Sequence, residues 1–242
     1  MAVTSADIHF FKAAEGDSEG GAMGAVEITG TAKNNFWPNV SDAERIAGGE
    51  RIRKWYFENQ NSTDALLVPS TYVFQTPTNT TEYLGFGWNH ADDDDSTQGN
   101  MTAWSANAVL AAVSDGADTR TLTIMGLNTS GTPTTEDVVL AGASEVLSAT
   151  SWSVVYAVRV SAISASRTAT IKQGTGGTTR GTIGTNFLSC WLWLAVTTKA
   201  TGIRLPDLPA GLEYGFWDRL TWSAAVGSVR PDQSVIGVEE NT

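Results

Sequence analysis

The stretch GDSEGG at residues 16–21 has a serine, Ser18, in the pattern Gly-x-Ser-x-Gly, which in hydrolases presents a nucleophile on a sharp turn. Such a serine needs a histidine and an acid placed around it. His9 and His90 are the only histidines, and His9 precedes the serine. A catalytic triad in which histidine and aspartate precede the serine in the chain is also excluded, because the 17 residues before Ser18 are too few to build the scaffold of such a triad. We therefore expect Ser18 to lie in a turn and to have no catalytic role.

The acidic run Asp92 to Asp95 is the second group that could do chemistry, since neighbouring carboxylates bind hard cations such as calcium. It lacks the alternate spacing and the final glutamate of an EF-hand loop. His90 has no second histidine or cysteine nearby for a zinc site. The run is expected to be a solvated loop and not a required metal site, and we predict no cofactor.

Cysteine and tryptophan complete the candidate groups. Cys190 lies in the apolar segment FLSCWLWLAV, where a thiol acts as a small hydrophobic group, and a single cysteine excludes an internal disulfide. The tryptophans could form a sugar-stacking platform, or they could fill a core and anchor interfaces. Those considered are Trp37, Trp55, Trp88, Trp191, Trp193, Trp217 and Trp222.

The elements expected to position these groups are strands. The 242 residues include 24 glycines, and few windows show helical periodicity. In residues 50–61, Trp55 and Phe57 share the apolar face of an alternating pattern, and Lys54 and Tyr56 fall on the other. Residues 120–127 and 136–140 read as a hairpin with a long loop. The one expected helix is SDAERIAGG, with Ser41 as N-cap, Glu44 three residues on, and Gly48 as its stop.

The polar loop at residues 91–103 divides the strands into two groups. We therefore predict an all-β fold of two β-sandwich-like domains with short turns and little helix, residues 1–95 and residues 96–242. The net charge of −11 argues against nucleic acid and anionic membranes as partners. We expect no secretory signal, because the N-terminal residues lack a basic region followed by a long apolar stretch. The longest apolar run of the chain is far shorter than the about 20 residues of a helix that spans a membrane.

Residues 202–222, GIRLPDLPAGLEYGFWDRLTW, combine two prolines with many large apolar groups. Pro206 and Pro209 remove ladder donors, so we expect an irregular arm and not a regular central strand. Its side chains pack either on their own domain or against a neighbouring subunit. We predict an oligomeric or lattice-bound protein in which this arm forms the interface. The expected interface residues are Leu212, Tyr214, Phe216, Trp217 and Trp222.

Two segments resemble modules of virion structural proteins of tailed bacteriophages. The first is a Ser-Gly-Gly turn followed by an F-x-x-V-(S/T)-x-x-E turn, a glycine and a strand. Its matching residues are Ser18, Gly20, Gly21, Phe36, Val40, Ser41, Glu44, Gly49, Arg53, Lys54, Trp55, Tyr56, Phe57 and Asn59. The second is similar to a β-unit of capsid and tail proteins. Its matching residues are Thr123, Gly126, Ser130, Gly131, Thr135, Glu136, Val138, Leu140 and Gly142.

The two matches cover about half of the chain and bring no catalytic group with them. Trp37 and the FLSCWLWLAV strand depart from the pattern and leave the place in the virion open. The resemblance implies a non-enzymatic structural component made in the host cytoplasm and located in the virion, with a capsid decoration (cement) protein preferred. Its expected partners are copies of itself and other virion proteins, the major capsid protein among them. The alternatives are a neck, tail or baseplate protein, or a carbohydrate-binding module of a receptor-binding tail protein.

Overall fold

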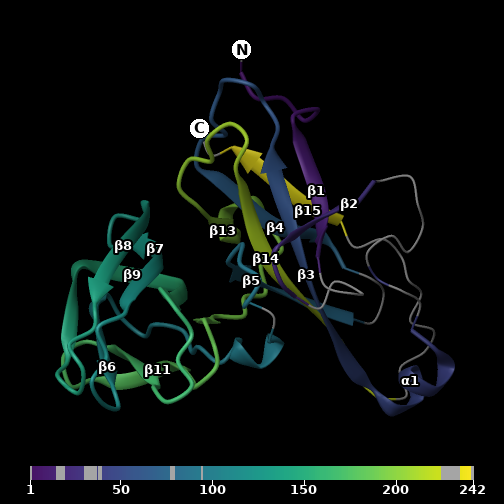
Figure 1. The fold of residues 1–242 in the computed structure, drawn as a ribbon. Helices are drawn as coiled ribbons and strands as arrows, with labels where there is room; N and C mark the ends of the chain where they lie inside the picture. Colours follow the sequence, from purple (N-terminus) through teal and green to yellow (C-terminus); the bar gives the residue numbers. More distant parts are fainter. Residues whose placement is uncertain are drawn as a thin grey trace.

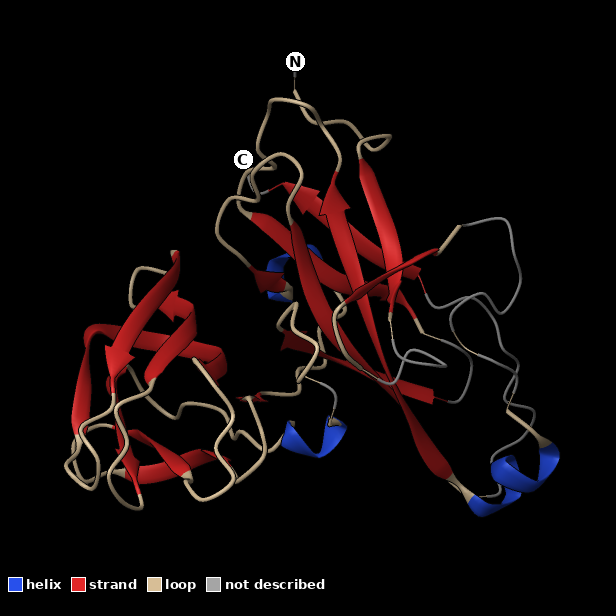
Figure 2. Cartoon of the chain, in the orientation of Figure 1, coloured by secondary structure: helices blue, strands red, loops and turns tan. Residues whose placement is uncertain are grey.

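The computed structural model describes residues 2–14, 20–29, 37, 40–76, 80–93, 95–224 and 235–240. The ribbon forms two lobes that lie side by side, as Figure 1 shows. We call strands β1 to β5 and β13 to β15 the first lobe, and strands β6 to β12 the second lobe. Strands dominate both lobes (Figure 2), and the predicted all-β fold is confirmed. No helix in the described ranges is long and apolar enough to cross a membrane.

The first lobe is built on an antiparallel five-stranded sheet in the order β2-β1-β3-β14-β5. Alternating apolar residues and small turns produce these strands. Their bounds are β1 Ile8–Ala13, β2 Met23–Glu27, β3 Gly49–Asn59, β5 Thr80–Gly87 and β14 Glu213–Trp222. The inner strand β14 pairs with β3 along its whole length and with the edge strand β5 along most of it.

The helix α1, Asp42–Ala47, directly precedes β3 and is the only α-helix in the part of the chain that the structure describes. Ser41 accepts a hydrogen bond from the Glu44 N–H, and the Glu44 carboxylate accepts one from the Ser41 N–H. Gly48 ends the helix with a φ of 74°, a conformation that favours glycine. The capping box and the stop predicted from the sequence are therefore confirmed.

A three-stranded sheet, β13-β4-β15, contributes to the same hydrophobic core as the five-stranded sheet. Its strands are β13 Ile203–Arg204, β4 Pro69–Gln75 and β15 Val235–Glu240. Within this core Trp55 stacks on Phe216 at 4.9 Å between ring centroids, and Phe57 stacks on Phe216 at 5.8 Å. Trp55 and Phe57 are fully buried, so the predicted apolar face of β3 is confirmed.

The second lobe is one antiparallel sheet in the order β11-β10-β6-β9-β7-β8, with β12 also paired to β9. Its core includes Leu110, Ile124, Trp152, Val158 and Cys190. The predicted hairpin is present as β7 and β8. The strand bounds are β6 Ala108–Ser114, β7 Thr121–Asn128, β8 Pro133–Val139, β9 Val146–Val160, β10 Ala169–Gln173, β11 Thr178–Ile183 and β12 Ser189–Trp191. Two 3₁₀ turns, η2 Ser96–Gln98 and η3 Lys199–Thr201, lie before β6 and after β12.

The sheets divide the chain differently from the expected boundary at residues 95 and 96. Strands β13, β14 and β15 all follow residue 202, yet they hydrogen-bond to β3, β4 and β5. The chain therefore leaves the first lobe after β5, builds the second lobe and returns. This return corrects the assignment of residues 203–240 to a C-terminal domain.

The segment expected to be an irregular arm contains a regular inner strand of the first lobe. Pro206 and Pro209 precede β14, so they remove no donor from its ladder. Gly215 lies inside β14, where a Cβ would come within 2.6 Å of Tyr56 Cε1. The glycine thus makes room for a ring and does not loosen the strand.

Candidate functional site

Ser18 lies outside the described residues, so its predicted role in a turn stays a prediction. The adjoining Gly20 and Gly21 are described and buried. The Gly21 carbonyl accepts hydrogen bonds from the Lys54 ammonium, at 2.9 Å, and from the Tyr56 hydroxyl. The end of the glycine-rich stretch at residues 16–21 is therefore attached to the middle of β3.

Lys54 and Asp93 form an ion pair with almost no exposure, at 2.8 Å from Nζ to Oδ2. The Lys54 ammonium also donates to the carbonyls of Trp88 and Asp93, both at 2.8 Å. The Asp93 carboxylate accepts from the Trp88 N–H at 2.9 Å and from the Ser189 hydroxyl. Buried charges are tolerated when paired and hydrogen-bonded in this way, so the pair holds four chain segments together.

Ser189 belongs to β12 of the second lobe, whereas Lys54 belongs to β3 of the first and Asp93 lies in the loop that follows β5. Trp191, two residues further on, stacks on Trp217 of β14 with 4.9 Å between ring centroids and an interplanar angle of 5°. The Lys54 ammonium lies 5.2 Å from the Trp217 ring centroid, within range of a cation–π contact. We call these five residues, Lys54, Asp93, Ser189, Trp191 and Trp217, the interlobe joint.

Glycines on β5 provide the space for this joint. A Cβ at Gly85 would lie 2.3 Å from Trp191 Cδ1, and one at Gly87 would lie 3.0 Å from Lys54 Cε. Without side chains at these positions, the Trp191 ring and the Lys54 stem rest directly on the sheet. The segments at Gly21, Trp88 and Asp93 cover the β3 face that carries Lys54 and Tyr56, and both side chains are fully buried.

Burial raises the pKa of the Tyr56 phenol well above its usual value, and the nearby Asp93 carboxylate adds to this effect. Tyr56 therefore remains a neutral hydrogen-bond donor at physiological pH. The joint was not predicted from the sequence, because alternation alone places Lys54 and Tyr56 on the less apolar face of the strand. Two features of the sequence could have indicated it: large side chains on both faces of the strand at residues 54–57, and the glycines at positions 85 and 87.

The acidic run is divided between a buried and an exposed part. Asp93 is buried in the joint, while Asp92 is exposed and its N–H donates to His90 Nδ1. Asp95 caps η2 by accepting from the Thr97 N–H at 2.8 Å. In the described ranges, which omit Asp94, no three histidine, cysteine or acidic residues are grouped as metal ligands would be. The expectation of a wholly solvated loop is therefore corrected at Asp93.

Four of the five predicted interface residues are wholly or partly covered by the chain itself. Phe216 and Trp217 are completely buried and Trp222 is 7% exposed, because β14 lies between β3 and β5 with packing on both faces. The half-buried Tyr214 donates its hydroxyl to the Pro206 carbonyl at 3.2 Å. Leu212 is 51% exposed. This corrects the interface prediction for Phe216 and Trp217, which are core residues.

The other candidate groups, Cys190 and the tryptophans, are buried or half-buried. Burial raises the pKa of the Cys190 thiol, which is fully enclosed in the second lobe. All nine tryptophans are described; seven are buried, and Trp104 and Trp193 are half-buried. The structure therefore has no exposed row of tryptophans of the kind that a sugar-stacking platform needs.

The inner face of the five-stranded sheet holds two buried acids, Asp218 of β14 and Glu82 of β5. They are diagonal neighbours, because Asp218 pairs with Leu84 and Leu220 pairs with Glu82. Burial raises the pKa of Asp218 well above 3.8, and the neighbouring Glu82 raises it further. The pair is thus a local cost to stability at neutral pH.

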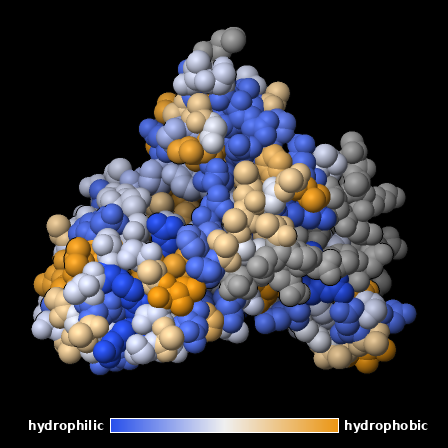
Figure 3. Space-filling model, viewed as in Figure 1, coloured by the Kyte–Doolittle hydropathy of each residue, from blue (hydrophilic) through white to orange (hydrophobic). Residues whose placement is uncertain are grey.

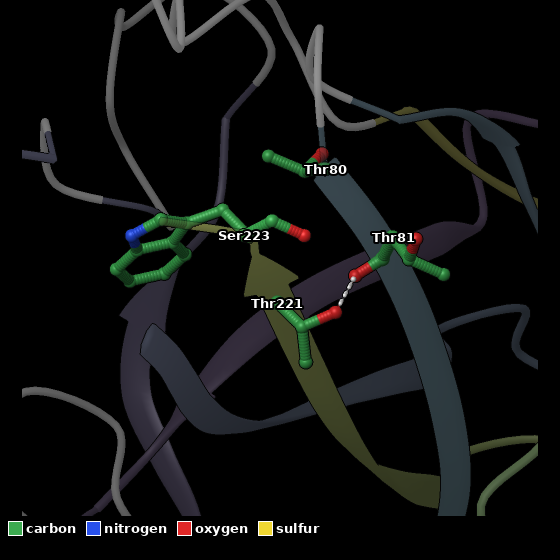
Figure 4. Close-up of a pocket in the computed structure, with 5 residues that line it drawn as sticks. Thr80, Thr81, Thr221 and Ser223 are labelled. Atoms are coloured by element: carbon green, nitrogen blue, oxygen red, sulfur yellow. Dashed lines mark hydrogen bonds between the residues drawn. The ribbon is translucent and has the colours of Figure 1, made fainter. Parts of the chain in front are cut away.

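A shallow pocket opens at the ends of β5 and β14 (Figure 4). Thr80, Thr81, Thr221, Trp222 and Ser223 line it. The Thr221 hydroxyl donates to the Thr81 carbonyl at 3.1 Å, and the Trp222 Nε1 donates to the Glu44 carbonyl at 3.1 Å. The chain itself therefore satisfies the Thr221 hydroxyl and the Trp222 indole N–H.

Comparison of this chain with known proteins found no matching family model, no similar curated protein and no similar solved structure.

Proposed function

We propose that this chain is a non-enzymatic structural component of a bacteriophage particle, and that within the particle it is a capsid decoration protein. Its partners are then copies of itself and other virion proteins, including the major capsid protein. Neck, tail and baseplate positions are the alternatives within the same class. The proposal concerns assembly, and it assigns no catalytic group.

The observation that carries this proposal is the interlobe joint. A particle component has to keep its contact surfaces in a fixed relation while neighbours load it. The buried Lys54–Asp93 pair, the Ser189 contact and the Trp191–Trp217 stack join the two lobes through groups that would be costly to expose. Such a joint favours one orientation of the lobes, which suits a load-bearing part.

The placement of the two phage-like modules supports the same proposal. The residues of the first module that the structure describes fall on the turn at Gly21, on α1 and on β3. Those of the second fall on the β7–β8 hairpin and the turn after it. The residues that carry the two resemblances thus lie in turns and strands of different lobes.

Mass spectrometry of purified phage particles from the lysate that contains this chain tests the proposal. A copy number close to that of the major capsid protein supports the decoration role, and a much lower number supports the neck or baseplate. Absence of the chain from purified particles, while it is present in the lysate, overturns the proposal. Treating the particles with increasing concentrations of a chaotrope distinguishes a bound component from a contaminant, because only a bound component is released together with a defined part of the particle.

A further inference from the structure

The guanidinium of Arg219, on β14, lies between two aromatic rings. Its Cζ is 4.6 Å from the ring centroid of Tyr83 and 4.7 Å from that of Trp193. Tyr83 is the residue directly opposite Arg219 on β5, and Trp193 follows β12. Stacking on both sides holds a planar guanidinium in one orientation. We call these three half-buried residues the arginine clamp.

Nothing in the described part of the chain neutralises this cation. Lys54, Arg120 and Lys172 form ion pairs with aspartate or glutamate, but no ion pair includes Arg219. Its Nε is buried without a hydrogen-bond partner. The terminal nitrogens are not buried and make no hydrogen bond in the described ranges. The fork of donors is therefore held in place and directed to the surface with no acceptor.

The chemistry of this fork indicates its ligand. A guanidinium whose plane is fixed matches the two oxygens of a carboxylate, and such bonds are among the strong ones. The net charge of −11 repels polyanions at long range, so an extended phosphate backbone is disfavoured. Arginine, tryptophan and tyrosine together are the residues that dominate binding energy at protein interfaces.

We propose that Tyr83, Arg219 and Trp193 form a docking site for an aspartate or glutamate side chain of a partner protein. The inference deepens the proposed function and rests on it, because the partner would be a neighbouring subunit of the particle. The surface itself is mixed, with apolar residues in small separate patches on the face that Figure 3 shows. A charged anchor flanked by aromatic rings provides specificity that such a surface lacks.

The clamp also connects the lobes, since Trp193 follows a second-lobe strand and Arg219 belongs to the first lobe. A purely structural role therefore also predicts lower stability when Arg219 is replaced. The test consequently needs a binding readout. The indole N–H resonance of Trp193, assigned with the Trp193→Phe variant, provides this readout in a ¹⁵N-labelled sample.

The probe is a blocked Gly-Glu-Gly peptide, which presents a single carboxylate and is therefore little repelled by the net charge of −11, with inorganic phosphate in a separate titration. We expect a saturable shift of the Trp193 resonance with the peptide, and affinity lower by about tenfold or more in Arg219→Gln, as for loss of a charge-assisted bond. Arg219→Lys keeps the charge without the planar fork and is expected to bind in between; it also serves if the glutamine variant does not fold. Arg167→Gln is the matched control, because Arg167 makes no ion pair or cation–π contact in the described ranges, and it should bind like the wild type.

Three results would overturn the docking site: no shift with the peptide, a shift that Arg219→Gln leaves intact, or a tighter response to phosphate than to the peptide. The outcome is separate from that of the proposed function. If the chain is present in particles but its arginine clamp does not bind the peptide, only the docking site is refuted. If the chain binds the peptide but is absent from particles, the particle role is refuted.

Discussion

Replacing Lys54 by methionine tests the interlobe joint directly. Methionine keeps most of the apolar volume of the lysine stem and removes the ammonium, whose three N–H groups are shared among four acceptor oxygens, the carbonyls of Gly21, Trp88 and Asp93 and the Asp93 carboxylate. The Asp93 charge then remains buried without its partner. Breaking a buried pair in this way costs about 3–5 kcal/mol, because one charge is left uncompensated.

For a chain of this size that cost corresponds to a fall in melting temperature of about 6–20 °C. Urea unfolding, followed by tryptophan fluorescence and by circular dichroism, measures the free energy. The two signals also show whether the lobes still unfold together, since the joint connects them. We expect the transitions to coincide in the wild type and to separate in Lys54→Met.

A double-mutant cycle with Asp93→Asn isolates the pair. The combined variant should be more stable than the sum of the two single changes predicts, because no charge is then left alone. Lys12→Met is the matched control: Lys12 pairs with Trp55 on the neighbouring strand, is half-buried and has no ion pair in the described ranges. If Lys54→Met unfolds at the same urea concentration as Lys12→Met, the joint does not stabilise the protein as argued.

Three further outcomes are expected. The pKa of Asp218 is raised in the folded state, so its contribution to stability is complete below about pH 3.8 and is lost as the pH rises through the raised pKa, by about 1.4 kcal/mol per pH unit for one proton. In Asp218→Asn the free energy of unfolding measured between pH 4 and 8 should lose this slope. An unchanged slope would exclude the pair with Glu82 as its source. Gly85→Ala brings a Cβ into the Trp191 ring, so it should cost about 1–3 kcal/mol by urea unfolding, and a neutral effect would mean that the ring is not seated on the sheet. EDTA should leave the melting temperature unchanged, as the acidic run at residues 92–95 is not expected to hold a required ion; a fall that calcium reverses would contradict this.

Local patterns were sufficient for much of the first lobe. The alternation in β3 identified Trp55 and Phe57 as core residues, because side chains two apart on a strand share a face. The capping box at Ser41 and Glu44 located α1, since its bonds involve only neighbours within three residues. The polar turn expected at residues 128–135 located the β7–β8 hairpin for the same reason, although β8 begins at Pro133, so the connection is shorter than the long loop expected. In each case the physical cause lies within a few residues of its effect.

Pairing between distant segments decided the rest, and no local pattern contains it. Whether β14 is an arm or a central strand depends on β3 and β5, which precede it by more than a hundred residues. Lys54 has the alternation of a solvent-facing residue, yet it is buried because Gly21, Trp88 and Asp93 arrive from other segments. The sequence by itself determined which residues share a face. Only the tertiary structure decided which faces are covered, because burial depends on what packs against a face and not on its own periodicity.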